Sequence, residues 1–219
     1  METVLNVGLT ETAVKGLSKS SGNPRFAYDS YRRLIMMYAD VVMEKSNNIS
    51  SNNGIRHKLE ECMDILKTKK KYEKDTDLNE DDLKNLCNQF KQIILDTLGV
   101  EFPDDAETQL WDTIKAVFHS WNGDRAKNYR KIEGISDRIG TAVNVQSMVF
   151  GNMGDGSATG VAFTRNPSTG ENIFYGEWLE NAQGEDVVAG TRTPNPLNSE
   201  SKSIQSEGLE SLEEKYPVL

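Results

Sequence analysis

The chain has 219 residues, which is enough for one large domain or two small ones with a sizeable buried core. Its 34 acidic residues outnumber the 25 basic ones, and this balance argues against a general nucleic-acid binder, because phosphate contacts need clustered Lys and Arg. No apolar run approaches the roughly 20 residues of a membrane helix, and the first residues lack the basic and apolar regions of a secretory signal.

Up to about residue 135, apolar residues recur at the spacing of an α-helix. The pattern predicts helices over 25–44, about 55–66 and 125–132. Two more are predicted between them, one that begins after an N-cap at Asn79 and one that begins at a capping box formed by Asp104 and Glu107. The residues expected to face a core are Tyr31, Leu34, Ile35, Tyr38, Val42, Leu59, Met63, Leu66, Leu83, Leu86, Cys87, Phe90, Ile94, Leu110, Ile114, Val117, Phe118 and Trp121. A cofactor groove or a partner surface is the alternative reading of these stripes. The polar stretch 45–54 is expected to be a loop.

After residue 135 the apolar period shortens towards two, as in β-strands. The pattern predicts strands over 142–150, around Val161 and Phe163, and over 172–178, with consecutive strands antiparallel. The tail from about Pro194 starts as a loop and is expected to end in an amphipathic helix. Helices followed by strands favour an α+β fold.

We therefore divide the chain into four parts. These are a residual segment of a nucleotide-binding subdomain (1–24), a mainly helical subdomain (25–134), a β-rich segment (135–195) and a tail (196–219).

The two cysteines, Cys62 and Cys87, are too few and too far apart for a zinc set, and each falls at an apolar position of a helical pattern. We expect reduced, buried thiols in an intracellular protein. His57 and His119 have no partner at the spacing of a metal site or a catalytic triad, so both are expected to be structural or surface residues.

Four glycines mark the segment "GNMGDGSATG", residues 151–160. Glycines let backbone N–H groups approach a ligand closely, which is how phosphates are cradled. The segment is neither a Walker loop nor a dinucleotide fingerprint, so its pattern alone leaves open a phosphate cradle and a plain hairpin connection. Just before it, "QSMV" (146–149) ends a predicted strand. Such an edge can offer one N–H and one C=O to an adenine ring held between Met and Val.

Four long blocks carry a resemblance: "GNPRFAYDSYRRLIMMYADVVM" (22–43), "RAKNYRKIEGISDRIGTAVNVQSMVFGN" (125–152), "GVAFTRNPSTGE" (160–171) and "NAQGEDVVAGTRTP" (181–194). They resemble the amino-terminal, ATP-grasp-like nucleotide-binding domain of the pyruvate, phosphate dikinase family. Phosphoenolpyruvate synthases share the "TGVAFTRNP"-type block more loosely. The likeness runs from Met1 to about Pro196.

The resemblance implies a phosphotransferase that interconverts ATP, phosphate and pyruvate with AMP, pyrophosphate and phosphoenolpyruvate. In the family this domain passes a phosphoryl group from ATP to a histidine on a separate swivelling domain. The residues that match the family's ATP-binding positions are Thr3, Gln146, Met148, Val149, Thr159 and Gly160. Glu185 and Arg192 match positions at the wall of the cleft.

The resemblance also implies ATP and Mg²⁺ as ligands of the whole enzyme, but the family's metal ligands, triphosphate cations and phosphohistidine motif match nothing here. We therefore expect a fragment, incomplete at both ends, with no catalytic or metal-binding residue and no activity alone. Its expected partners are ATP and the phosphohistidine domain, within a homo-oligomeric enzyme of the cytoplasm or an organelle, with no nucleic acid or membrane. The alternatives are a non-catalytic nucleotide-binding regulator and an interaction module.

Overall fold

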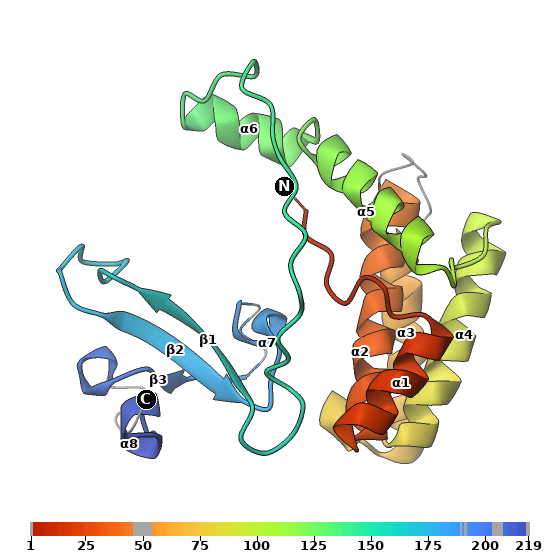
Figure 1. The fold of residues 1–219 in the computed structure, drawn as a ribbon, viewed down its shortest axis with the longest axis horizontal. Coiled ribbons are helices and arrows are strands. Elements are labelled where there is room, and N and C mark those ends of the chain that lie inside the picture. Colours follow the sequence, from red (N-terminus) through yellow and green to blue (C-terminus); the bar gives the residue numbers. More distant parts are fainter. Residues whose placement is uncertain (1, 46–53, 189, 191, 203–207, 218–219) are drawn as a thin grey trace. The chain divides into compact units, whose positions relative to one another are not determined.

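The computed structural model of the protein describes residues 2–45, 54–188, 190, 192–202 and 208–217. The chain divides into two compact units, Met1–Met148 and Val149–Leu219, each of which is described by itself (Figure 1). Unit 1 is helical and unit 2 carries a small antiparallel sheet. This mixture confirms the predicted α+β class.

Unit 1 is built from α-helices joined by short connections. In chain order they are α1 (Glu11–Ser21), α2 (Pro24–Tyr38), the π-helical η1 (Ala39–Lys45), α3 (Gly54–Lys70), the 3-10 turn η2 (Asp75–Asp77), α4 (Glu80–Leu98), α5 (Ala106–Ser120) and α6 (Asp124–Ile132). Helix α2 packs against α1 and α4, and α3 packs against α4 (Figure 1). Most of the loop predicted over 45–54 lies outside the described residues.

Side-chain caps decide where two of these helices begin. Asn79 accepts a hydrogen bond from the Asp82 backbone N–H and forms a reciprocal capping box with that residue, which confirms the predicted cap. The capping box predicted at Asp104 is wrong. The cap of α5 is the next residue, Asp105, whose carboxylate accepts from Thr108 N at 2.7 Å. Asp104 instead accepts from Glu11 N, so it ties α1 to the start of α5.

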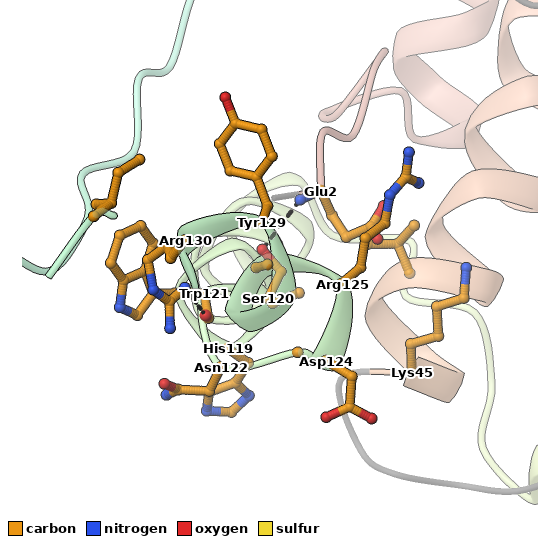
Figure 2. Close-up of a pocket in the computed structure, with 15 residues that line it drawn as sticks. Glu2, Lys45, His119, Ser120, Trp121, Asn122, Asp124, Arg125, Tyr129 and Arg130 are labelled. Atoms are coloured by element: carbon orange, nitrogen blue, oxygen red, sulfur yellow. Dashed lines mark hydrogen bonds between the residues drawn. The ribbon is translucent and has the colours of Figure 1, made fainter. Parts of the chain in front are cut away.

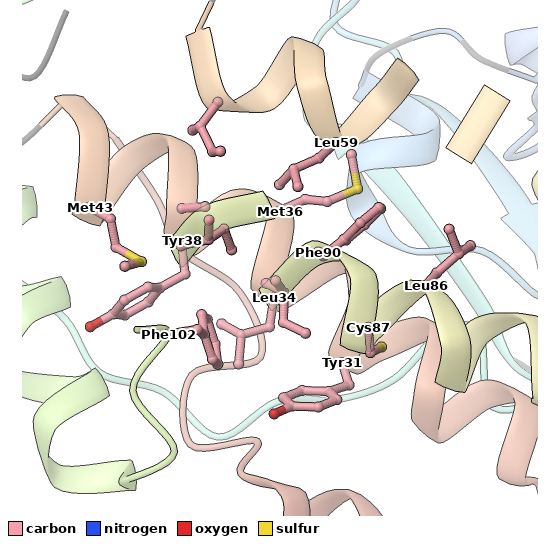
Figure 3. Packing of buried hydrophobic residues seen from close by; sticks show 14 of the residues in the cluster. Tyr31, Leu34, Met36, Tyr38, Met43, Leu59, Leu86, Cys87, Phe90 and Phe102 are labelled. Atoms are coloured by element: carbon pink, nitrogen blue, oxygen red, sulfur yellow. The ribbon is translucent and has the colours of Figure 1, made fainter. Parts of the chain in front are cut away.

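The core of unit 1 lies between α2, α3 and α4, where the predicted apolar stripes of α2 and α4 are fully buried (Figure 3). Phe102 closes it with edge-on contacts to Tyr31 and Tyr38, at ring-centre distances of 6.2 and 5.4 Å. Each large apolar side chain buried here contributes about 1.5–3 kcal/mol to folding. These stripes are therefore packing surfaces, not a cofactor groove.

The stripe predicted for α5 is wrong in part. Phe118 remains 46% exposed, whereas the polar Gln109 is fully buried. The side chain of Gln109 accepts from Gly8 N at 2.9 Å and donates to Pro103 O at 2.8 Å. These bonds hold a polar side chain inward, because a buried amide without partners would cost about 1–3 kcal/mol.

A buried ion cluster stabilises α2. Asp29 accepts from Arg32 at 2.7 Å and from Arg33 at 3.1 Å, and Asp29 and Arg32 are both almost fully buried. Burial alone raises the pKa of Asp29, but the charges of Arg32 and Arg33 outweigh it and lower that pKa to about 2. The carboxylate is therefore ionised throughout the neutral range.

Unit 2 is organised around a sheet in the order β1-β2-β3. Its elements are β1 (Ala158–Phe163), β2 (Tyr175–Glu180), α7 (Gly184–Val188), β3 (Asn195–Pro196), the 3-10 turn η3 (Ser199–Ser201) and α8 (Leu212–Lys215). Strands β1 and β2 pair antiparallel from Ala158 opposite Glu180 to Phe163 opposite Tyr175, which confirms the predicted pairing. The tail ends in one helical turn, α8, whose Ser211 caps it.

The strand predicted over 142–150 is wrong, because residues 140–150 form no strand. A strand needs a neighbour for its backbone N–H and C=O groups, and no described segment pairs with this one. Its side chains stay open to solvent, with Val145 67% and Val149 93% exposed. The glycine-rich segment is thus not a hairpin connection between two described strands.

Candidate functional site

The residues expected to bind a nucleotide are divided between the two units. Thr3, Gln146 and Met148 belong to unit 1. Those of unit 2 are Val149, Thr159, Gly160, Glu185 and Arg192. The geometry is therefore given for each unit separately.

In unit 2, the glycine-rich segment is held at both ends by the chain that follows β2. Ala182 N donates to Gly151 O at 2.9 Å, and Asn181 N donates to Ser157 O at 2.8 Å. A Cβ on residue 151 would lie 2.5 Å from Ala182 O, so only glycine fits at this crossing. The segment is consequently fixed in place at its start and its end.

Strand β1 carries Thr159 and Gly160 along the edge of the described sheet. A Cβ on Gly160 would lie 2.7 Å from Glu177 O, so packing against β2 by itself requires glycine there. Along an edge strand, alternate backbone N–H groups point away from the neighbouring strand. Of the consecutive residues Thr159 and Gly160, only one can therefore offer its N–H to an anionic ligand at this edge.

The two residues predicted at the cleft wall differ in their surroundings. The Arg192 guanidinium donates to the carbonyls of Asn181 and Glu180, each at 3.2 Å, so it fastens the end of β2. Glu185 lies half-buried in the first turn of α7. The contacts of Arg192 are those of a structural residue.

No pattern in the sequence marked Gln183, yet it is the most unusual side chain of this region. It is only 4% exposed, and neither its amide nitrogen nor its amide oxygen has a hydrogen-bond partner among the described residues. The same holds for Oδ1 of Asn152. Both residues adjoin the hydrogen bond between Ala182 and Gly151.

In unit 1, a pocket of about 1070 Å³ opens where α5 turns into α6 (Figure 2). Glu2 lines it, and its backbone N–H donates to Ser120 Oγ at 3.1 Å, so the neighbouring Thr3 stands exposed beside the pocket. Gln146 and Met148 are exposed on the unpaired segment 140–150.

The charges at this pocket do not favour a triphosphate. Arg130 lies 3.9 Å above the Trp121 ring and pairs with Asp137 at 2.7 Å, so its charge is neutralised. Lys45 likewise pairs with Asp40 at 2.8 Å. Among the other described lining residues, the positive charge of Arg125 is accompanied by two carboxylates, those of Glu2 and Asp124. The pocket therefore offers no surplus positive charge.

The described residues also do not fit a magnesium site. No group of three or more His, Cys, Asp or Glu side chains gathers among them. We therefore derive no reaction step through a metal ion. Within the same part of the chain, every helix is too short or too polar to span a bilayer.

Comparison with known proteins decides the family. Residues 1–215 match the family model described as "Pyruvate phosphate dikinase, AMP/ATP-binding domain". The chain belongs to this family. The pyruvate, phosphate dikinase of Clostridium symbiosum is 54% identical over 198 residues, which cover 90% of this chain and 22% of that protein.

Other dikinases align over nearly all of the chain. That of Rhizobium meliloti (strain 1021) is 49% identical over 99% of this chain, and the chloroplastic dikinase 1 of Arabidopsis thaliana is 51% identical over 100% of it. The chain spans 23% and 22% of these two relatives. The AMP/ATP-binding domain family is thereby established, on about a fifth of a dikinase's length.

Proposed function

We propose that this chain supplies part of the ATP-grasp-like nucleotide site of a pyruvate, phosphate dikinase. The observation that carries the proposal is the match of residues 1–215 to an AMP/ATP-binding domain. In the proposed nucleotide site, Gln146, Met148 and Val149 contact the nucleobase. The phosphates meet the backbone of Thr159 and Gly160, with Thr3, Glu185 and Arg192 at the edges of the site.

The exposure of the hinge residues supports this assignment. Val149 is 93% and Met148 36% exposed, although both are large apolar side chains. Exposed apolar side chains next to backbone donors and acceptors suit the two faces of an adenine ring, which is apolar on its faces and polar at its edge. The edge position of β1 adds N–H donors for the phosphates.

The reaction of the whole enzyme is a reversible phosphoryl transfer from ATP to a histidine on a partner domain, and then towards pyruvate. Such transfer depends on positioning and on neutralising the phosphate charges, which Mg²⁺ supplies in part when bound. Arg192 of this chain is occupied by backbone carbonyls, and the described residues hold no metal-ligand group. We therefore propose that the chain binds nucleotide but does not transfer phosphate alone.

The remaining features of the whole enzyme follow from the same proposal. The phosphohistidine domain is the partner that receives the phosphoryl group, and a homo-oligomer is the expected assembly. The expected location is intracellular, in the cytoplasm or in an organelle, and the chloroplastic name of the Arabidopsis relative supports the organelle.

Titration calorimetry of the chain with AMP tests the proposal. Because Val149 is almost fully exposed, Val149→Asp leaves folding unchanged and places a charge where the adenine ring would lie. We expect AMP binding to the wild type and at least a roughly tenfold loss in this variant. Val145→Asp, at another exposed valine of the same segment, is the matched control and should bind normally. Equal AMP affinities for all three proteins would refute the hinge assignment.

An interaction module is the second candidate, and one observation favours it. On and after α6, three large apolar side chains close together in the sequence, Tyr129, Ile132 and Ile139, are 60%, 80% and 72% exposed. A module of this kind would retain its protein partner after Val149→Asp and lose it after Ile132→Asp. A nucleotide-binding chain would instead lose AMP binding after Val149→Asp and keep it after Ile132→Asp.

A further inference from the structure

Gln183 carries a buried amide whose hydrogen-bonding groups are unused. Its side chain is 96% removed from solvent, and both the Nε2 and Oε1 atoms lack partners among the described residues. A buried polar group left in this state costs about 1–3 kcal/mol. No described residue offsets this cost, and a bound molecule that exchanged hydrogen bonds with the amide would remove it.

The backbone around Gln183 is held firmly. Its own N–H donates to the Asp186 carboxylate at 2.8 Å, at the start of α7. The preceding residue, Ala182, is bonded to Gly151 O at 2.9 Å. A side chain mounted on backbone fixed at two points is suited to recognising a ligand, because little order has to be gained on binding.

These bonds place Gln183 close to the proposed adenine hinge. Gly151 follows Val149 by two residues, and two residues of extended chain span at most about 7 Å. Because Ala182 is bonded to Gly151, its neighbour Gln183 lies within a few ångströms of the backbone that leads from Val149. All of these residues belong to unit 2, so the argument depends on one unit only.

We propose that the Gln183 carboxamide recognises the adenine base of the bound nucleotide. Its oxygen accepts from the N6 amino group of adenine and its nitrogen donates to N7, the two-bond arrangement in which glutamine reads adenine in DNA. The hinge backbone then donates an N–H to adenine N1 and accepts the other N6 hydrogen on a C=O. Guanine presents acceptors at both O6 and N7, so it leaves the amide oxygen of Gln183 facing another acceptor. This inference rests on the proposed function and adds to it a residue that selects adenine over guanine.

Calorimetric titrations of the full chain with AMP and GMP test the proposal, using Gln183→Met. Methionine keeps the length and volume of glutamine and removes both polar atoms. We expect AMP affinity to fall about tenfold while GMP affinity stays the same, so that the selectivity for AMP is lost. The thermal stability of the variant should be equal or higher, because a buried amide without protein partners has been removed. Gln92→Met, at an exposed glutamine of α4, is the matched control.

A structural role for Gln183 predicts the reverse pattern, with lower stability and an unchanged ratio of AMP to GMP affinity, and would overturn the proposal. A second measurement needs no variant: 7-deaza-AMP lacks the N7 acceptor and should bind the wild type several-fold more weakly than AMP. Equal binding of AMP and 7-deaza-AMP would overturn the proposal while leaving nucleotide binding intact. A wild-type chain that binds neither AMP nor GMP would refute the proposed function and this inference together.

Discussion

Replacing Gly160 by alanine tests how closely the proposed phosphate-binding strand is tied to its neighbour. The added Cβ would lie 2.7 Å from Glu177 O and 3.2 Å from Trp178 Cβ, both on β2. The first distance is several tenths of an ångström too short, and the atom it meets is backbone held in the β1–β2 register. Because neither strand can rotate a side chain away, β1 must shift, at a cost of about 1–3 kcal/mol.

Hydrogen exchange measured by mass spectrometry localises this effect. A loss of that size accelerates exchange of the β1 and β2 amides roughly 5- to 150-fold, while the helices of unit 1 keep their protection. AMP affinity should fall in parallel, since the displaced strand carries the proposed phosphate donors. Gly208→Ala is the control, because a Cβ there meets nothing within 4 Å and the backbone is not left-handed. Wild-type exchange rates and AMP affinity in Gly160→Ala would refute the reasoning.

Three further predictions concern unit 1. Asp29→Asn leaves Arg32 buried without its 2.7 Å partner and should lower the free energy of unfolding by about 3–5 kcal/mol. Urea denaturation followed by helical circular dichroism measures this loss, with the exposed Glu61→Gln as the control. A loss below about 1 kcal/mol, no larger than that of the control, would contradict the prediction. Because the folded pKa of Asp29 is about 2 against its ordinary 3.8, the ionised group contributes about 2 kcal/mol above about pH 4, and this contribution disappears as the pH falls towards 2. The stability difference between wild type and Asp29→Asn should therefore shrink over that interval, and a constant difference would be the contrary result. Cys87 is 2% exposed and burial raises the pKa of its thiol to about 12, so a thiol reagent should label the half-buried Cys62 first, in a fast phase of the reaction. Cys62→Ser should abolish this fast phase, and a fast phase that survives in the variant would contradict the prediction.

Helices whose signals are local could be predicted from the sequence. On α2 and α4 the apolar residues recur at the helical period, and Asn79 lies next to the helix it caps. The apolar period of α5 predicts the wrong buried face, because the partners that draw Gln109 inward, Gly8 and Pro103, lie outside the helix. Tertiary hydrogen bonds therefore overrode a pattern that favoured Phe118 as a core residue.

The sheet shows more clearly that a local sequence pattern does not reveal tertiary contacts. The alternation over 142–150 predicts a strand, but a strand also requires a partner segment, which alternation does not supply. The glycine pattern indicates the approach of a ligand at Gly160, and the structure adds a packing reason, because a Cβ there would lie 2.7 Å from Glu177 O. Gln183 could not be predicted from the sequence, because its unusual property, a buried amide without partners among the described residues, arises only once the chain has folded.

Hydrogen exchange of the wild-type chain with and without saturating AMP tests the central claim most directly, because it shows where the nucleotide binds. We predict protection of residues 146–149, the glycine-rich segment 151–160 and the residues around Gln183, with no change at the turn between α5 and α6. Protection confined to the pocket at that turn, or no protection anywhere, would contradict the proposed site.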